Sequence, residues 1–174
     1  MGTCENEGEA RALGGTMWGR LCWVGLMAVG CGNWGATPPC SIDATMTGMV
    51  EADWSDEDKV KCTGFGPSID NSVDLYFKKD FTSVRVRFDW IRKGDEGAHD
   101  DVHVSVEEKG EKWASYDPVV CVGDLTRHEK LGKSMDGGVW AVEGSVTCDR
   151  ALEPFLSEGT VGLETVEFAG GYTD

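Results

Sequence analysis

Apolar and polar residues alternate through most of the chain beyond residue 40, and this period of two constrains the fold more than any other feature. Successive side chains of a β-strand point to opposite faces, so such segments predict strands with one buried face. We expect an all-β fold, an antiparallel β-sandwich of about seven to nine strands, with a β-barrel as the alternative. Only the segment 149–156 is expected to form a short helical turn. The expected strands lie within residues 41–50, 73–78, 84–90, 102–106, 119–123, 140–148 and 161–168.

One hairpin can be predicted with its register. Antiparallel pairing of 84–91 with 101–107, with Trp90 opposite Val102, gathers the apolar residues of both strands on one buried face. The other face then collects arginines, acidic residues and His103. A slip of one residue would place valines opposite arginines. The basic residues here are therefore expected to be cross-strand partners rather than an anion site.

The balance of charge limits the partners of the chain. Its 174 residues include 16 Lys and Arg against 31 Asp and Glu, which gives a formal net charge of −15 at pH 7. Such a chain repels phosphate, so nucleic acid is excluded as a partner and an anionic membrane surface is disfavoured. The 40% of hydrophobic residues and seven Trp are enough for the core of one domain.

The first thirty residues carry the features of an export signal. Residues 21–30 are uncharged and follow Arg20, but this run is about half the roughly 20 residues that a membrane-spanning helix needs. It ends in Met27-Ala28-Val29-Gly30-Cys31, which resembles the lipobox of bacterial lipoproteins. The resemblance implies that Cys31 is lipidated and becomes the mature N-terminus in the cell envelope. Gly32, rather than Asp, is compatible with sorting to the outer membrane, facing the periplasm or the exterior.

The same resemblance divides the chain. Residues 1–30 would be the leader, 31–39 the lipidated cysteine and tether, and 40–174 a single β-sandwich domain. Because acidic residues precede the run, a start at Met17 would give a more ordinary signal. The alternatives are an ordinary cleaved signal and a short buried element of a cytosolic domain.

The number of cysteines is consistent with export of the protein from the cytoplasm. The chain has seven, and removal of the leader and of Cys31 leaves four, an even number suited to an oxidising compartment. Four cysteines allow three pairings. We favour the two most local ones, with free buried thiols as the alternative. These pairings are Cys40 with Cys62, and Cys121 with Cys148.

The candidates for a metal site are few. His99, Asp101 and His103 could bind Zn²⁺, although an extended strand places the two histidines about 13 Å apart. His128 lies among charged residues and is expected to face solvent. The acidic stretches 51–58 and 95–101 could hold Ca²⁺, but neither has the spacing of an EF-hand loop.

The expected function is therefore binding or envelope structure without catalysis, with an envelope protein or glycan as partner and no required cofactor. One alternative is a small secreted hydrolase or metal-dependent enzyme that uses His103 with Asp89 or Asp101. Another is a module that binds calcium or carbohydrate, the latter by stacking on tryptophan. The tryptophans expected inside the fold are Trp54, Trp90, Trp113 and Trp140.

Overall fold

The computed structural model describes residues 35–67, 71–116, 119–135, 137–156 and 158–174, so the predicted leader and Cys31 lie outside it. Every regular element in these ranges is a β-strand, which confirms the predicted all-β class. None of the described residues belongs to a helix long and apolar enough to cross a membrane. The strands are β1 (Ser41–Gly48), β2 (Ala52–Trp54), β3 (Lys61–Phe65), β4 (Val73–Lys79), β5 (Thr82–Phe88), β6 (Gly97–Glu108), β7 (Glu111–Ala114), β8 (Cys121–Ser134), β9 (Gly137–Cys148), β10 (Glu153–Pro154) and β11 (Val161–Thr173).

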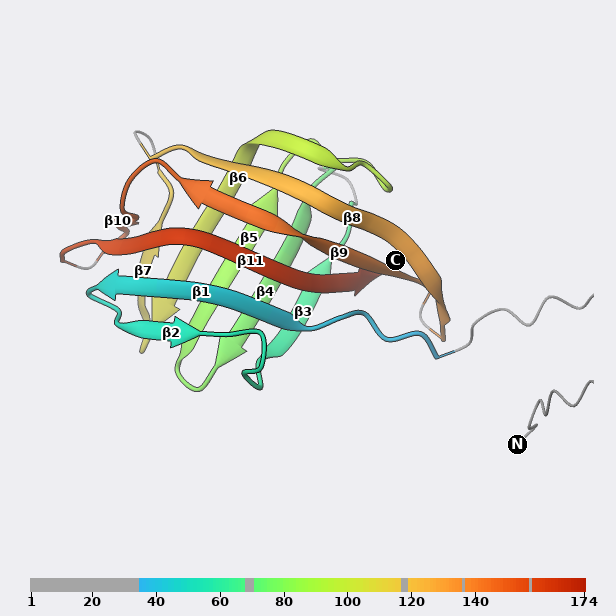
Figure 1. Cartoon of the computed structure of the whole chain (residues 1–174), viewed down its shortest axis with the longest axis horizontal. Coiled ribbons are helices and arrows are strands. Elements are labelled where there is room, and N and C mark those ends of the chain that lie inside the picture. The colour runs from blue at the N-terminus through green and yellow to red at the C-terminus, as the bar shows by residue number, and fades with distance from the viewer. Residues whose placement is uncertain (1–34, 68–70, 117–118, 136, 157) are drawn as a thin grey trace, which may run out of the picture. The chain divides into compact units, whose positions relative to one another are not determined.

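The strands form one continuous antiparallel sheet that curls over itself. Its hydrogen-bonded order is β2-β1-β11-β9-β8-β6-β5-β4-β3, while β7 pairs with β6 and β10 pairs with β7. In Figure 1, β1, β2, β8, β9 and β11 lie nearer the viewer, and β3, β4 and β5 cross behind them. The curl brings the inner faces of the two halves together, as in a sandwich, although no break separates two sheets.

The core fills the space between these two halves. Phe168 of β11 contacts Phe77 of β4 and Phe88 of β5, with ring centroids 6.2 and 5.9 Å apart. Trp54 and Trp113 are also buried, as the sequence predicted. The alternation that marked the strands therefore separates core side chains from outward-facing polar ones.

The two predicted disulfides are present. Cys40–Cys62 joins the residue before β1 to β3, two parts of the chain that are far apart in the order of the sheet. Cys121–Cys148 instead joins directly opposite residues of the neighbouring strands β8 and β9. The first disulfide therefore holds the curl closed, and the second reinforces an existing strand pair.

β5 and β6 form the predicted antiparallel pair, but their register differs from the prediction by two residues. Val102 lies opposite Phe88 rather than Trp90, and Val104 lies opposite Val86. A shift of two residues leaves every side chain on its predicted face. The predicted burial of Trp90 is wrong, because this residue follows the strand with φ 58° and a 75% exposed side chain.

The predicted helical turn at 149–156 is also wrong. Glu153 and Pro154 form β10 against β7, and Leu152 makes a bridge to Val161. These backbone hydrogen bonds extend the edge of the sheet, so the segment continues the β-structure.

Candidate functional site

Two carboxylates and one imidazole meet on the outer face of β5 and β6. His103 Nε2 lies 3.3 Å from Asp89 Oδ2 and 3.7 Å from Asp101 Oδ1. One ligand atom from each of the three residues lies within 4.8 Å of the others. His103 was paired with Asp89 or Asp101 in the sequence analysis, and the structure brings both carboxylates to it, Asp101 from the same strand and Asp89 from the residue after β5. This group could hold a divalent cation through one nitrogen and two oxygens.

His99 does not belong to this group. A β-bulge between His99 and Val102 shifts the register of β6, so the ring of His99 turns to the inner face. There it packs edge-on against Phe88, with ring centroids 5.7 Å apart. The prediction that His99, Asp101 and His103 could bind one ion together is therefore not supported by their placement.

A basic pocket adjoins the same group. Its volume is about 250 Å³, and Arg85, Arg87 and Lys112 line it together with Asp89 and His103. Both nearby arginines have carboxylate partners, since Arg85 binds Asp74 at 2.7 and 2.8 Å and Arg87 donates from Nε to Asp89 at 2.7 Å. Both arginines are cross-strand partners, but they pair with Asp74 of β4 rather than with residues of β6 as the predicted hairpin implied. The hydrogen bonds from Arg85 to Asp74 hold the pKa of its guanidinium above the usual value.

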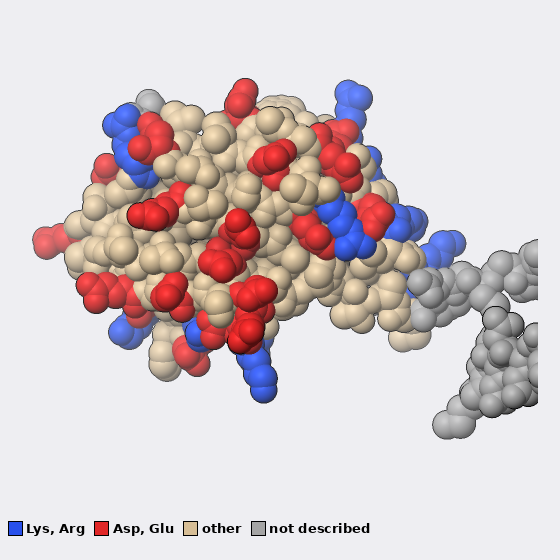
Figure 2. Space-filling view, viewed as in Figure 1, with Lys and Arg blue, Asp and Glu red and all other residues tan. Residues whose placement is uncertain are grey.

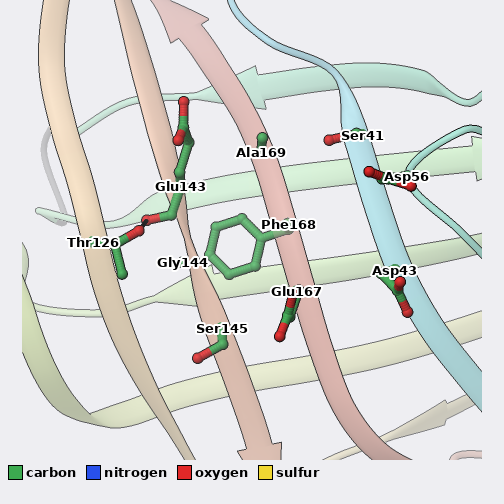
Figure 3. Close-up of a pocket in the computed structure, with 10 residues that line it drawn as sticks. All are labelled: Ser41, Asp43, Asp56, Thr126, Glu143, Gly144, Ser145, Glu167, Phe168 and Ala169. Atoms are coloured by element: carbon green, nitrogen blue, oxygen red, sulfur yellow. Dashed lines mark hydrogen bonds between the residues drawn. The ribbon is translucent and has the colours of Figure 1, made fainter.

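A second, acidic groove of about 500 Å³ runs over the outer face of β1, β8, β9 and β11. Figure 3 shows Asp43, Glu143 and Glu167 around this groove, each on a different strand, with Asp56 nearby. Glu143 accepts a 2.5 Å hydrogen bond from Arg127 Nη1. Because these residues are far apart in the sequence, local spacing could not have predicted the groove.

The acidic stretch 51–58 does not converge on one site. Asp53 accepts a hydrogen bond from Thr45, while Asp58 pairs with Lys79 at 2.6 Å. The hydrogen bond from Lys79 lowers the pKa of Asp58. Asp56 alone reaches the groove. The side chains of the predicted calcium cluster are thus spread over separate contacts.

The sequence analysis missed a buried polar cluster beneath the ends of β8, β9 and β11. His128, predicted to face solvent, is 1% exposed, and its Nε2 is hydrogen-bonded to Tyr172 Oη at 2.9 Å. Trp140, which is only partly buried, stacks on Tyr172 with a 10° angle between the rings. Burial lowers the pKa of His128 and raises that of Tyr172. The rings of His128, Trp140 and Tyr172 thus pack against one another.

Comparisons with models of protein families, with curated proteins and with solved structures found no match for this chain. The functional argument therefore rests on the residues and contacts described above.

Proposed function

We propose that the chain is a bacterial lipoprotein, anchored in the cell envelope through a lipid on Cys31. Its β-domain would act outside the cytoplasm as a binding or structural module rather than as an enzyme. The proposal includes sorting to the outer membrane, with the domain facing the periplasm or the exterior, with which Gly32 after the lipidated cysteine is compatible. The partner would be an envelope protein or a glycan.

The observation that carries this proposal is the pairing of all four body cysteines. Cys40–Cys62 and Cys121–Cys148 form two disulfides, and stable disulfides are typical of oxidising compartments outside the cytoplasm. With these four paired, Cys31 is the one cysteine beyond residue 30 that remains for another role. A free thiol directly after the small residue Gly30 is what lipidation needs.

The outer surface supports binding more than catalysis. Several of its charged groups form pairs with one another, such as Arg85 with Asp74 and Arg127 with Glu143. Figure 2 shows acidic side chains spread over the face that β1, β9 and β11 present. A face on which acidic side chains predominate favours partners of positive charge and speeds their association.

The test is the intact mass of the full chain expressed in a bacterial cell, measured before and after reduction. We expect an N-terminal peptide that begins at an acylated Cys31, and a gain of four hydrogens on reduction of the two disulfides. Cys31→Ser should abolish acylation, whereas Cys22→Ser in the apolar run should leave it unchanged. A chain that keeps the residues before Cys31 and carries no acyl group would contradict the proposal.

A second candidate function is binding of a divalent cation, favoured by the meeting of Asp89, Asp101 and His103. The test is a thermal shift of the purified protein on addition of Zn²⁺ or Ca²⁺. We expect a stabilising shift that His103→Ala abolishes and His99→Ala preserves, since His99 turns to the inner face. Equal shifts in the two variants, or none in the unmodified protein, would reject this site.

A further inference from the structure

The end of the domain that carries the β8–β9 hairpin differs in charge from the acidic face. Lys130 and Lys133 of β8 are exposed, and within the described ranges neither forms an ion pair. Lys93, in the loop before β6, pairs with Asp174. The Nζ atoms of Lys93 and Lys130 lie 5.8 and 5.9 Å from the centroid of the Trp140 ring. Figure 2 shows blue side chains at this end, with red ones among them. We call Lys93, Lys130, Lys133 and Met135 the hairpin end.

An apolar side chain projects from the same place. Met135 follows the last residue of β8 and is 96% exposed, while β9 begins at Gly137. Asp136, between them in the sequence, lies outside the described residues. An apolar tip flanked by lysines, whose stems are apolar and whose amines are charged, suits the boundary between lipid tails and headgroups.

The chain enters the domain at this end. The backbone N–H of Gly35 donates to the carbonyl oxygen of Lys133 at 3.3 Å, and Pro38 packs beside Gly171 of β11. Four peptide steps separate Gly35 from Cys31, and they span at most about 14 Å in any conformation. A domain of this size is roughly 35–40 Å across. A lipid on Cys31 would therefore keep the hairpin end near the membrane.

We propose that the hairpin end is a membrane-docking surface, where Lys130 and Lys133 bind anionic lipid headgroups and Met135 enters the headgroup region. The proposal rests on the lipid anchor at Cys31 and adds the orientation of the domain on the bilayer. At this end Asp174 pairs with Lys93, and the unpaired carboxylates that contribute to the net charge of −15 repel an anionic membrane. Screening limits their repulsion to a distance of about 8 Å at physiological ionic strength.

The experiment places a photoreactive p-benzoylphenylalanine at position 135 of the full chain, and at Met49 in a control protein. Met49 is 51% exposed and follows β1, whose other end adjoins the tether, so it lies far from the hairpin end. Acylation of Cys31 is first verified by mass on the same membranes. We expect phospholipid adducts at position 135 to exceed those at position 49 at least tenfold.

The lysines are tested in the same membranes. Lys130→Gln with Lys133→Gln should lower the yield of anionic-lipid adducts at position 135 several-fold without releasing the protein. The control is Lys78→Gln with Lys109→Gln, which removes two lysines near the C-terminal ends of β4 and β6, away from the hairpin end. This variant should leave the adduct yield unchanged.

The outcomes separate the two proposals. Acylated protein with equal labelling at positions 135 and 49, or with protein adducts in place of lipid at 135, would overturn the docking surface alone. Protein that is never acylated would overturn the anchor and the docking surface together.

Discussion

At the scale of single residues, the buried hydrogen bond between His128 and Tyr172 is expected to contribute to the stability of the fold. Tyr172→Phe keeps the ring that stacks on Trp140 but leaves His128 Nε2 without its partner. A buried polar atom without a partner costs about 1–3 kcal/mol. We expect a loss of stability of that size in urea unfolding. Tyr76→Phe, on the half-buried outer side of β4, is the control and should change stability by less than about 0.5 kcal/mol.

The same histidine predicts a dependence of stability on pH. Burial lowers the pKa of folded His128 below the unfolded value of 6.5, although the nearby Asp95 and Glu96 oppose this effect. The unfolded chain therefore binds more protons in this range, so stability is fully present above about pH 6.5 and is lost as the pH falls toward the folded pKa. One proton contributes at most about 1.4 kcal/mol per pH unit.

Unfolding measured between pH 7 and pH 5 checks this prediction. His128→Gln cannot titrate, so its free energy of unfolding should fall less steeply over this range than that of the unmodified protein. Carboxylates with lowered pKa values, such as Asp58 and Asp174, act below about pH 4 and lie outside this window. Parallel curves for the two proteins would show that another group controls the dependence.

The wrong expectation for His128 has a physical cause. Leu125 is buried, and strict alternation would then bury Arg127 and expose His128. A register irregularity between Leu125 and Arg127 inserts a residue and turns His128 inward. The bulge in β6 likewise turns His99 away from Asp101 and His103. Alternation gives the faces of a strand only up to its first bulge, and a single sequence does not mark where the bulges lie.

At the scale of strands, the curl of the sheet depends on a close approach of β3 to β11. A Cβ atom on Gly64 would lie 2.2 Å from the carbonyl oxygen of Gly171, which is backbone and cannot turn aside. We expect Gly64→Ala to destabilise the protein by about 2–4 kcal/mol, because the two strands must separate. Urea unfolding measures this cost, and the exposed neighbour Thr63→Ala is the control. Equal stabilities of the two variants would mean that the strands adjust freely at this point.

The sequence predicted the disulfide pairs fully, but the strand positions and registers only in part. Period-two alternation located β1, β4, β5, β9, β11 and part of β6, whereas only the first residues of β8 fell within the predicted apolar run 119–123. The strands β2, β3, β7 and β10 were missed because two to five residues are too short to show a period. The register of β5 and β6 failed by two residues, since such a shift preserves both faces and alternation cannot detect it. The favoured disulfide pairs were right because each joins cysteines that are near in the sequence.

At the scale of the whole molecule, the sequence determines the net charge but not where charges meet. The acidic groove draws Asp43, Glu143 and Glu167 from three strands that are neighbours only in the folded sheet. The same arrangement leaves exposed lysines at the hairpin end. The number of charged residues gives the average charge of the surface. The charge of each face, and so the partners that it can bind, depends on the strand order.

The groove itself should weaken the fold at low salt. Asp43 and Glu167 are directly opposite on β1 and β11, and like charges in such a pair are destabilising. We expect Glu167→Gln to raise the melting temperature in dilute buffer, by the equivalent of about 0.2–1 kcal/mol. Glu143→Gln lines the same groove but breaks the ion pair with Arg127, so it should not stabilise the protein.

Salt separates this effect from a change in packing. In 0.5 M NaCl the screening length falls to about 4 Å, so the gain from Glu167→Gln should largely disappear. A gain that persists at high salt would assign it to packing or hydrogen bonding rather than to charge. The two variants make the same chemical change on neighbouring strands and therefore have the same net charge. Any difference between their melting temperatures at low salt comes from the charged neighbours that the strand order gives to each glutamate.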